Sequence, residues 1–363
     1  MMSKIRLFNP SLPKNSVSVI KEVHAENKPS LIKGSYTGQR WRHKSMEKTL
    51  DWITDLKKSE ELHRIAQDNL NLWAKHKSAS PKLVEVIHRD WGLAALEATK
   101  KYGVFYSVLN MASPMFPGGA ALEGGSAQEE NIWHRSNCAQ SLLDNIIYLD
   151  KEAKAFCYRD TAKKLLEAKI KMTEEERETL KKHGGETDSQ GYKVFFSPEP
   201  RVCFRGPEIS FPTAPDDFTH VRYVADSDMS YAFLPESDIF PFYELRSAAP
   251  QLPSTPHDLD LETEKQYIAD LRRRIAAQLD TLILANQPNA ILGAWGCGEF
   301  KNDPQIVARV YSEEIEKRAH FFEHLVFPII NTGSHNNYAI FNQQLSGIKL
   351  GNTLSVGSDL SLD

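Results

Sequence analysis

The sequence predicts an α/β fold in which one sheet is sandwiched between helices. The first supporting observation is that strand-like and helix-like segments alternate through most of the chain. The second is that two junctions between a strand and a helix carry several glycines, at 118–125 and 293–298. Ligands of α/β proteins bind beyond the carboxyl ends of the strands, so these two junctions are the predicted site.

The first strands of the predicted sheet lie between residues 82 and 112. "KLVEVIH" (82–88) is predicted as a strand, and "VFYSVLNMA" (104–112) as a buried strand because it is almost continuously apolar. Between them, residues 90–103 are predicted as a helix that has Asp90 as its N-cap and Gly103 just past its end. Upstream, leucines and isoleucines recur at roughly helical spacing over 45–78.

The other elements follow from the same patterns. They are a helix over 131–149, two short strands around a turn over 193–206, mainly loops over 212–260, a helix over 263–287, a strand at 290–295, a helix over 305–324 and a strand at 325–330.

These elements predict one large domain at 41–345, which includes a helical extension at its start and a charged helical insertion near 150–190. Residues 1–40 are predicted as an irregular arm, because prolines interrupt a polar stretch. Residues 346–363 are polar and rich in Ser and Gly, which predicts a flexible tail.

Composition narrows the class of protein. Hydrophobic residues make up 41% and charged residues 25%, which is ordinary for a globular domain. The net charge of −4 gives no broad basic footprint, so neither direct nucleic-acid binding nor membrane binding is expected. The four cysteines are scattered, and no signal peptide or membrane span is evident. We therefore expect a cytoplasmic protein, and export without a signal peptide remains open.

The first glycine-rich junction, "PMFPGGAALEGGSAQEENIWHRS" (114–136), raises a question about its chemistry. It combines bare backbone at Gly118 and Gly119 with the adjacent acids Glu129 and Glu130. Glycines let backbone approach a phosphate, although they also simply make tight turns. Adjacent helical residues point about 100° apart, so one acid can face a ligand's hydroxyls while the other reaches a neighbouring bond. Two such carboxyls suit the hydrolysis of a glycosidic bond.

Two other patterns are predicted to be structural. "HFFEH" (320–324) matches an inverted zinc-protease motif through His320 and His324, but no third ligand is evident, and histidines are ordinary at a helix end. Cys297 lies between two glycines and is predicted as a small buried residue rather than a nucleophile. The full nucleotide-binding motifs of kinases and dehydrogenases are absent.

Taken together, "VLNMASPMFPGGAALEGGSAQEE" and "LGAWGCGEFKNDPQIVA" (292–308) resemble the two loops of the microbial-type poly(ADP-ribose) glycohydrolases, a branch of the macrodomain superfamily. The family's catalytic signature is Gly-Gly-Gly, six to eight residues, then Gln-Glu-Glu. Weaker similarities bring the coverage to roughly residues 40–345. The resemblance implies a macrodomain-like three-layer α/β/α sandwich with a mixed central sheet and an N-terminal helical extension.

The resemblance also implies roles for single residues. Glu130 is the expected general acid and then base, and Glu129 the residue that fixes the ribose. The expected substrate-binding residues are Gln128, Gly118, Gly119, Asn110, Ser113, Gly296, Cys297, Gly298, Glu299 and Phe300. Of these, Phe300 is expected to pack against the distal ribose. Neither a metal nor another cofactor is implied.

The sequence departs from the signature at two places. Ala120 replaces the third glycine, and Phe116 stands where the family commonly has a polar residue. The methyl group is tolerated if the φ of Ala120 is negative.

The expected substrate is ADP-ribose in poly(ADP-ribose) or on a modified protein. Two alternatives stay open: a hydrolase specific for mono-ADP-ribosylated protein, and a macrodomain that binds ADP-ribose without cutting it.

Overall fold

A computed structural model describes residues 16–185, 189–214, 217–223, 229–252, 259–331 and 336–351, with the backbone alone at 36 and 210–223. The arm up to residue 15 and the tail from residue 352 lie outside the described residues.

Helices account for much of the described chain. Their bounds are α1 Val17–Glu26, α2 Leu31–Tyr36, α3 Gln39–Ile53, α4 Leu56–Ala74, α5 Trp91–Tyr102, α6 Gln128–Arg135, α7 Asp160–Leu166, α8 Glu174–Lys182, α9 Leu261–Leu284, α10 Pro304–Arg318 and α11 Asn337–Leu345, with short 3₁₀ helices at Asn137–Leu143 and Glu236–Asp238.

The strands are short except for β11. Their bounds are β1 Leu83–Ile87, β2 Ser107–Met111, β3 Ile147–Asp150, β4 Ala155–Tyr158, β5 Ile170–Lys171, β6 Tyr192–Lys193, β7 Phe195–Phe196, β8 Arg201–Cys203, β9 Ser210–Ala214, β10 Asp217–Tyr223, β11 Phe240–Ser247, β12 Asn289–Ile291 and β13 His324–Pro328.

The main sheet has seven strands in the order β1-β13-β12-β2-β11-β7, with β8 also paired to β11. The pairs from β1 to β11 are parallel, while β7 and β8 run antiparallel to β11. The sheet is therefore mixed, as expected. Three further two-stranded ribbons, β3-β4, β5-β6 and β9-β10, lie outside it.

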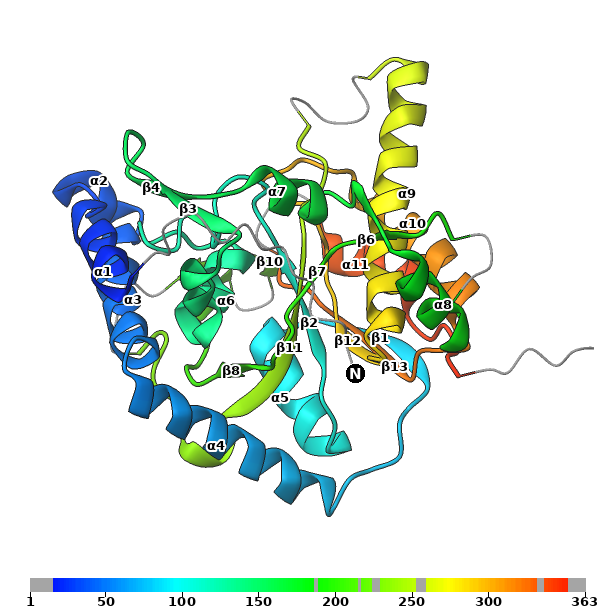
Figure 1. Cartoon of the computed structure of the whole chain (residues 1–363), viewed down its shortest axis with the longest axis horizontal. Helices are drawn as coiled ribbons and strands as arrows, with labels where there is room; N and C mark the ends of the chain where they lie inside the picture. The colour runs from blue at the N-terminus through cyan, green and yellow to red at the C-terminus, as the bar shows by residue number, and fades with distance from the viewer. Residues whose placement is uncertain are drawn as a thin grey trace, which may run out of the picture.

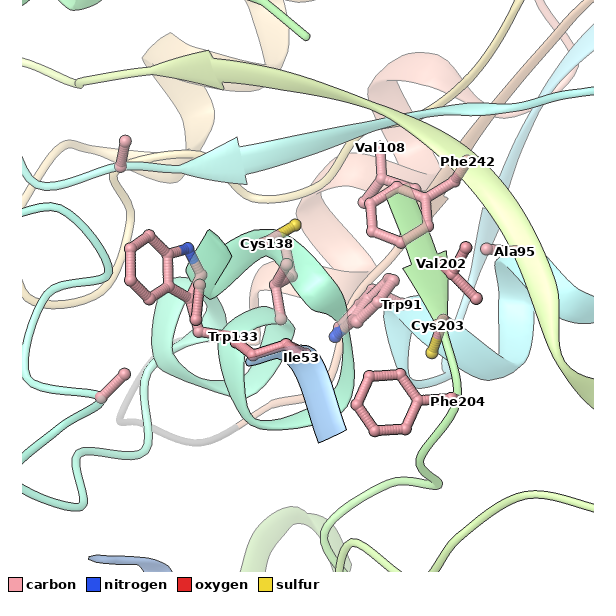
Figure 2. Packing of buried hydrophobic residues seen from close by; sticks show 14 of the residues in the cluster. Ile53, Trp91, Ala95, Val108, Trp133, Cys138, Val202, Cys203, Phe204 and Phe242 are labelled. Carbon is pink, nitrogen blue, oxygen red and sulfur yellow. The ribbon is translucent and has the colours of Figure 1, made fainter. Parts of the chain in front are cut away.

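Side chains of the sheet alternate between two hydrophobic clusters. Val108 and Ile291 belong to the cluster on the side of α5, whereas neighbouring residues of the same strands, Leu109 and Ala290, belong to the cluster on the side of α9, α10 and α11. Figure 1 shows these helices covering the sheet from both sides. Figure 2 shows part of the first cluster, in which Phe242 of β11 packs against Trp91 of α5 with ring centroids 5.7 Å apart. The three-layer α/β/α prediction is confirmed.

Local capping explains why several predicted elements are found where expected. The Asp90 carboxylate accepts hydrogen bonds from Gly92 and Leu93 at 3.0 Å each, and Gly103 ends α5 in a left-handed conformation at φ +60°. Both features match the prediction for 90–103.

The prediction of an irregular arm at 1–40 is wrong for its described part, which contains α1 and α2. Pro29 lies between the two helices, so it separates them and interrupts neither. His24 of α1 stacks on His43 of α3 with ring centroids 4.0 Å apart, and each Nε2 hydrogen-bonds to the other residue's carbonyl oxygen. The N-terminal helices pack beside α6 on the left of Figure 1.

The largest disagreement concerns β11, which lies in a region predicted to be mainly loops. The sequence "FPFYELRS" has a proline and alternating charges, yet seven of its eight residues are buried. Its charges are paired, because Arg246 Nε donates to Glu244 Oε1 at 2.7 Å. Because the charged residues of this buried ion pair make a core strand look polar, the hydrophobic pattern predicts a surface loop where the structure has a strand.

Two smaller corrections concern the middle of the chain. The helix predicted over 131–149 ends at Arg135 and gives way to a 3₁₀ helix and then to β3. The charged insertion near 150–190 contains β4, α7, β5 and α8 rather than helix alone. The two strands predicted over 193–206 exist as β7 and β8, but each pairs with β11.

Candidate active site

The two glycine-rich junctions meet at the carboxyl ends of β2, β11 and β12. The carbonyl oxygen of Ser247, at the end of β11, accepts hydrogen bonds from Ala112 N at 3.1 Å and from Trp295 Nε1 at 2.9 Å. A Cβ on Gly293 would lie 2.6 Å from Cε of Met111. Three neighbouring strands thus hold the two loops side by side, as the topology rule for α/β sheets predicts.

Glu129 is fixed by the loop that precedes it. Its Oε2 accepts a hydrogen bond from Ser113 N at 2.6 Å, and its Oε1 accepts one from Gly118 N at 2.9 Å. The residue is 4% exposed. Both carboxylate oxygens are therefore held in place, each with lone-pair capacity left for one further donor.

Glu130 is held at one oxygen only. Its Oε1 accepts a hydrogen bond from Ala120 N at 2.9 Å, while its buried Oε2 has no hydrogen-bond partner in the described part of the chain. Gly119 lies directly against this carboxyl, because a Cβ there would be 2.4 Å from Oε1. An unpaired carboxyl oxygen inside a site is costly and is thus a mark of function.

The environment raises the pKa of both acids above the ordinary value for glutamate. Burial is the main cause for each. The neighbouring Glu130 raises the pKa of Glu129 further, and the exposed Glu299 of the second loop raises that of Glu130. This effect of Glu299 on Glu130 is further evidence that the two loops face one site.

Glu123, in the same loop, is a third acid of this kind. Burial and the charge of Glu130 raise its pKa, and its Oε2 is buried without a hydrogen-bond partner among the described residues. Glu123 was not predicted as a site residue, because a single acid in a glycine-rich loop is typical of the protein surface.

The glycines of the first loop have a steric role. Gly118 and Gly119 have φ values of +81° and +56°, and a Cβ on Gly118 would lie 2.3 Å from the ring of Trp133. The N–H of Gly118 binds Glu129, and the N–H of Gly119 binds the carbonyl of Phe116 at 3.0 Å. In this structure, neither N–H is free for a phosphate. Ala120 has no positive φ, so its methyl group causes no backbone strain at the position of the third glycine.

The second loop, residues 292–303, offers free donors instead. Among the described residues, no hydrogen bond uses the backbone N–H of Gly296, Gly298, Glu299 or Phe300. Gly298 and Glu299 are exposed, and a Cβ on Gly298 would have nothing within 4 Å. Open backbone with unpaired N–H groups is a suitable cradle for a diphosphate.

Asn302 fixes the shape of this loop, and sequence reasoning missed it. Its Nδ2 donates to the carbonyl oxygens of Pro250 at 2.8 Å, Gly296 at 3.0 Å and Phe300 at 3.3 Å. Asp303 then caps α10, whose first residue is Pro304. The positive end of the helix dipole therefore lies immediately after the loop, which favours an anion there.

The remaining predicted residues are in or next to the site. Gln128 joins α6 to β2, because its Nε2 donates to Leu109 O at 2.7 Å and its Oε1 accepts from Met111 N at 2.9 Å. Asn110 is fully buried and donates to Glu244 at 2.8 Å, while its Oδ1 is unpaired among the described residues. The Ser113 hydroxyl accepts from Met115 N at 3.2 Å and Phe116 N at 3.1 Å.

A buried ion pair of β11 supports the site. The guanidinium of Arg246 binds both oxygens of Glu244 at 2.7 Å, and it also contacts the Ser141 hydroxyl. Its Cζ lies 5.9 Å from the ring centroid of Trp133, the residue on which Gly118 packs. The positive charge of Arg246 acts against the rise in the pKa of Glu129. No sequence pattern indicated this pair, since it lies in the strand that was predicted as part of a loop region.

The N-terminal helices contact the same loop. A Cβ on Gly124 would lie 2.1 Å from the carbonyl oxygen of Gln39, at the start of α3. The Thr49 hydroxyl, also on α3, donates to His134 O of α6 at 2.6 Å. The extension thus packs behind the first glycine-rich loop and α6.

His320, His324 and Cys297, which were predicted to be structural, lie in ordinary structural environments. His324 bonds to the Tyr106 hydroxyl at 2.6 Å and to Glu85 at 3.1 Å, whereas His320 bonds to the carbonyl of Gly184. Burial raises the pKa of the Cys297 thiol, which makes it a poor nucleophile. The described ranges contain no cluster of three His, Cys, Asp or Glu that could hold a metal, and none of their helices could cross a membrane.

Solved structures similar to this chain include poly(ADP-ribose) glycohydrolases. That of Thermomonospora curvata is 18% identical with a TM-score of 0.48, and the alignment covers 84% of this chain and 99% of that one. The same enzyme bound to the inhibitor ADP-HPD is 19% identical, with the same TM-score and coverage. The Deinococcus radiodurans enzyme in complex with ADP-ribose is 21% identical with a TM-score of 0.44, covering 77% and 91%. No curated protein matches the chain.

A family model matches part of the chain. The model described as "Microbial-type PARG, catalytic domain" matches residues 26–164, where PARG stands for poly(ADP-ribose) glycohydrolase. The matched segment includes the whole glycine-rich loop together with Gln128, Glu129 and Glu130. The resemblance of this chain to the microbial-type poly(ADP-ribose) glycohydrolases, predicted from its sequence, is therefore confirmed.

Proposed function

We propose that this protein is an ADP-ribose glycohydrolase that cleaves the O-glycosidic bond of ADP-ribose units in poly(ADP-ribose) or on ADP-ribosylated protein. The observation that carries the proposal is the carboxyl of Glu130, which is fixed at Oε1 and unpaired at Oε2. Its raised pKa suits a group that must hold a proton before it reacts.

In the proposed reaction Glu130 donates one proton and later recovers one. Glu130 donates its proton to the leaving oxygen as the bond from the ribose anomeric carbon to that oxygen breaks. The sugar passes through a state with oxocarbenium character, which the nearby carboxylates stabilise. Water then adds to the anomeric carbon and gives its proton to the Glu130 carboxylate, so the acid is restored after each turnover.

Glu129 has a different role in this scheme. Its two oxygens are clamped by Ser113 N and Gly118 N, so the carboxylate is preorganised. The lone pairs that remain can accept hydrogen bonds from ribose hydroxyls and fix the sugar against Glu130. Gln128 holds α6 to β2 and thereby places both acids.

The second loop is the proposed site of the diphosphate. Its unpaired N–H groups, from Gly296 and from Gly298 to Phe300, can donate to phosphate oxygens. The half-buried Phe300 lies next to them and is the proposed contact of the distal ribose. The first loop contributes close packing through Gly119, which brings Glu130 within reach of the sugar.

An assay of the released product tests this function. The wild-type chain is incubated with poly(ADP-ribose) and, separately, with protein that carries single ADP-ribose units, and the products are identified by mass spectrometry. Release of free ADP-ribose from the polymer supports the proposal. Release from the modified protein alone would make it a mono-ADP-ribosylhydrolase. Binding of ADP-ribose without release from either substrate would show a macrodomain that binds only.

A further inference from the structure

Two large apolar side chains of the catalytic loop face solvent. Met115 and Phe116 are each 44% exposed, although they lie only a few residues before Gly118 and Gly119. Their exposure contrasts with Ala121 and Leu122 in the same loop, which are buried in the core. Apolar surface beside an active site is available for a substrate to cover.

The backbone that carries this pair is held from both sides. Met115 N and Phe116 N donate to the Ser113 hydroxyl, Met115 O accepts from Tyr158 N at 3.0 Å, and Phe116 O accepts from Gly119 N at 3.0 Å. The side chains therefore project from a fixed turn. A fixed platform loses little conformational entropy when a ligand binds to it.

The same turn contacts both acids. Ser113 N donates to Glu129 at its start, and Gly119, which is bonded to Phe116, lies against Oε1 of Glu130 at its end. Phe116 is thus hydrogen-bonded to Gly119, which contacts the proposed acid Glu130. The exposed pair therefore belongs to the same hydrogen-bonded turn that contacts both acids.

The chemistry of the leaving group distinguishes the two substrate classes. In poly(ADP-ribose) the leaving oxygen belongs to the adenosine ribose of the next unit, so an adenine ring is attached to the same sugar. On a modified protein the leaving atom belongs to an amino-acid side chain, which carries no such ring. A flat base stacks readily on an exposed aromatic side chain.

We propose that Phe116, with Met115 beside it, is the platform on which the adenine of the leaving ADP-ribose unit stacks, and that this pair selects polymer over single protein-linked units. The inference rests on the proposed glycohydrolase function. It concerns the leaving unit only, so the terminal ADP-ribose in the site is bound independently of Phe116.

Binding measured in the inactive Glu130→Gln background tests this directly. Poly(ADP-ribose) of defined length and free ADP-ribose are titrated into chains that carry Phe116, Phe116→Ala or Phe116→Tyr. We expect Phe116→Ala to weaken polymer binding about tenfold, the effect of losing one base stack, and to leave ADP-ribose binding unchanged. Phe116→Tyr keeps the ring and restores polymer binding. Leu72→Ala, at an exposed leucine on α4, is the matched control and changes neither affinity.

Two results would overturn the inference. Equal losses for polymer and ADP-ribose would mean that Phe116 shapes the pocket of the terminal unit. Unchanged polymer binding in Phe116→Ala would mean that no base stacks there. Failure of the proposed function is recognised separately, since a wild-type chain that neither cuts nor binds polymer fails before any Phe116 variant is compared.

Discussion

The backbone N–H of Ala120 donates a 2.9 Å hydrogen bond to Oε1 of Glu130, whose Oε2 has no partner in the described residues. One oxygen of the acid is thus fixed by the loop, and the other is left for chemistry. The contact depends on a main-chain group, so the side chain at position 120 is free to vary as long as its backbone conformation is kept.

Ala120→Gly should therefore keep both activity and fold. Ala120 has no positive φ, so glycine only adds freedom to the unfolded chain and costs about 0.4–1 kcal/mol. Urea denaturation and the rate of ADP-ribose release measure the two effects. A stability loss of several kcal/mol, or loss of turnover, would show that the methyl group packs in a way this account misses.

Substitution by alanine should have different effects at two glycines of the site. In Gly119→Ala the new Cβ would lie 2.4 Å from Glu130 Oε1 and the residue would keep a φ of +56°, so we expect at least a tenfold loss of turnover with about 1–3 kcal/mol of backbone strain. Gly298→Ala meets nothing within 4 Å and should fold with wild-type stability. Thermal denaturation and turnover of both variants check this, and equal behaviour of the pair would contradict it.

The pH dependence of turnover should reveal the effect of Glu299 on Glu130. The proposed acid must be protonated, so activity falls as the pH rises through its raised pKa. Burial remains in Glu299→Gln, but the negative charge that raises the pKa of Glu130 is gone. The alkaline limb of the profile should then move to lower pH. Glu60→Gln, at an exposed position on α4, is the control. A shift to higher pH, or an equal shift in the control, would refute the coupling.

The buried pair in β11 should be the most sensitive ionic contact of the fold. Burial acts to raise the pKa of Glu244, but the ion pair with Arg246 outweighs it and lowers the pKa to about 2. The stability that this carboxylate provides is complete above its ordinary pKa and is lost as the pH falls toward 2.

Glu244→Gln leaves Arg246 buried without its counter-charge, so we expect a loss of about 3–5 kcal/mol in urea denaturation at neutral pH. The difference from wild type should shrink as the pH falls toward 2. Glu178→Gln removes one partner of an exposed pair with Lys181 and should leave the urea midpoint unchanged. Equal midpoints for all three proteins would contradict a structural role for the pair.

The sequence predicted elements whose physical signal is local. α5 is one of them, since Asp90 and Gly103 cap it by contacts within a few residues. The two glycine-rich loops were also found, because strained backbone needs glycine and that need is visible in the letters. Glu129 and Glu130 were predicted as paired acids because their adjacency is also a local feature of the sequence.

What could not be predicted depends on contacts between distant segments. Glu244 and Arg246 look like surface residues until β11 is placed against β2, where Asn110 also binds Glu244. Asn302 shows its role only when it is seen to bond to Pro250, which lies 52 residues away in the chain. The use of the Gly118 and Gly119 N–H groups inside the loop was equally hidden, and it leaves the second loop as the proposed site of the diphosphate.

Glu130 is the general acid of the proposed reaction, and one comparison of turnover tests this assignment most directly. Glu130→Gln keeps the size of the side chain but cannot supply a proton, so ADP-ribose release should fall about 10²–10⁴-fold, and ADP-ribose affinity should change less than about tenfold. Glu129→Gln loses one of the two hydrogen bonds from Ser113 N and Gly118 N but keeps the proposed acid, so it should retain more turnover than Glu130→Gln. The opposite ranking, or full turnover in Glu130→Gln, would contradict the central claim that Glu130 is the general acid.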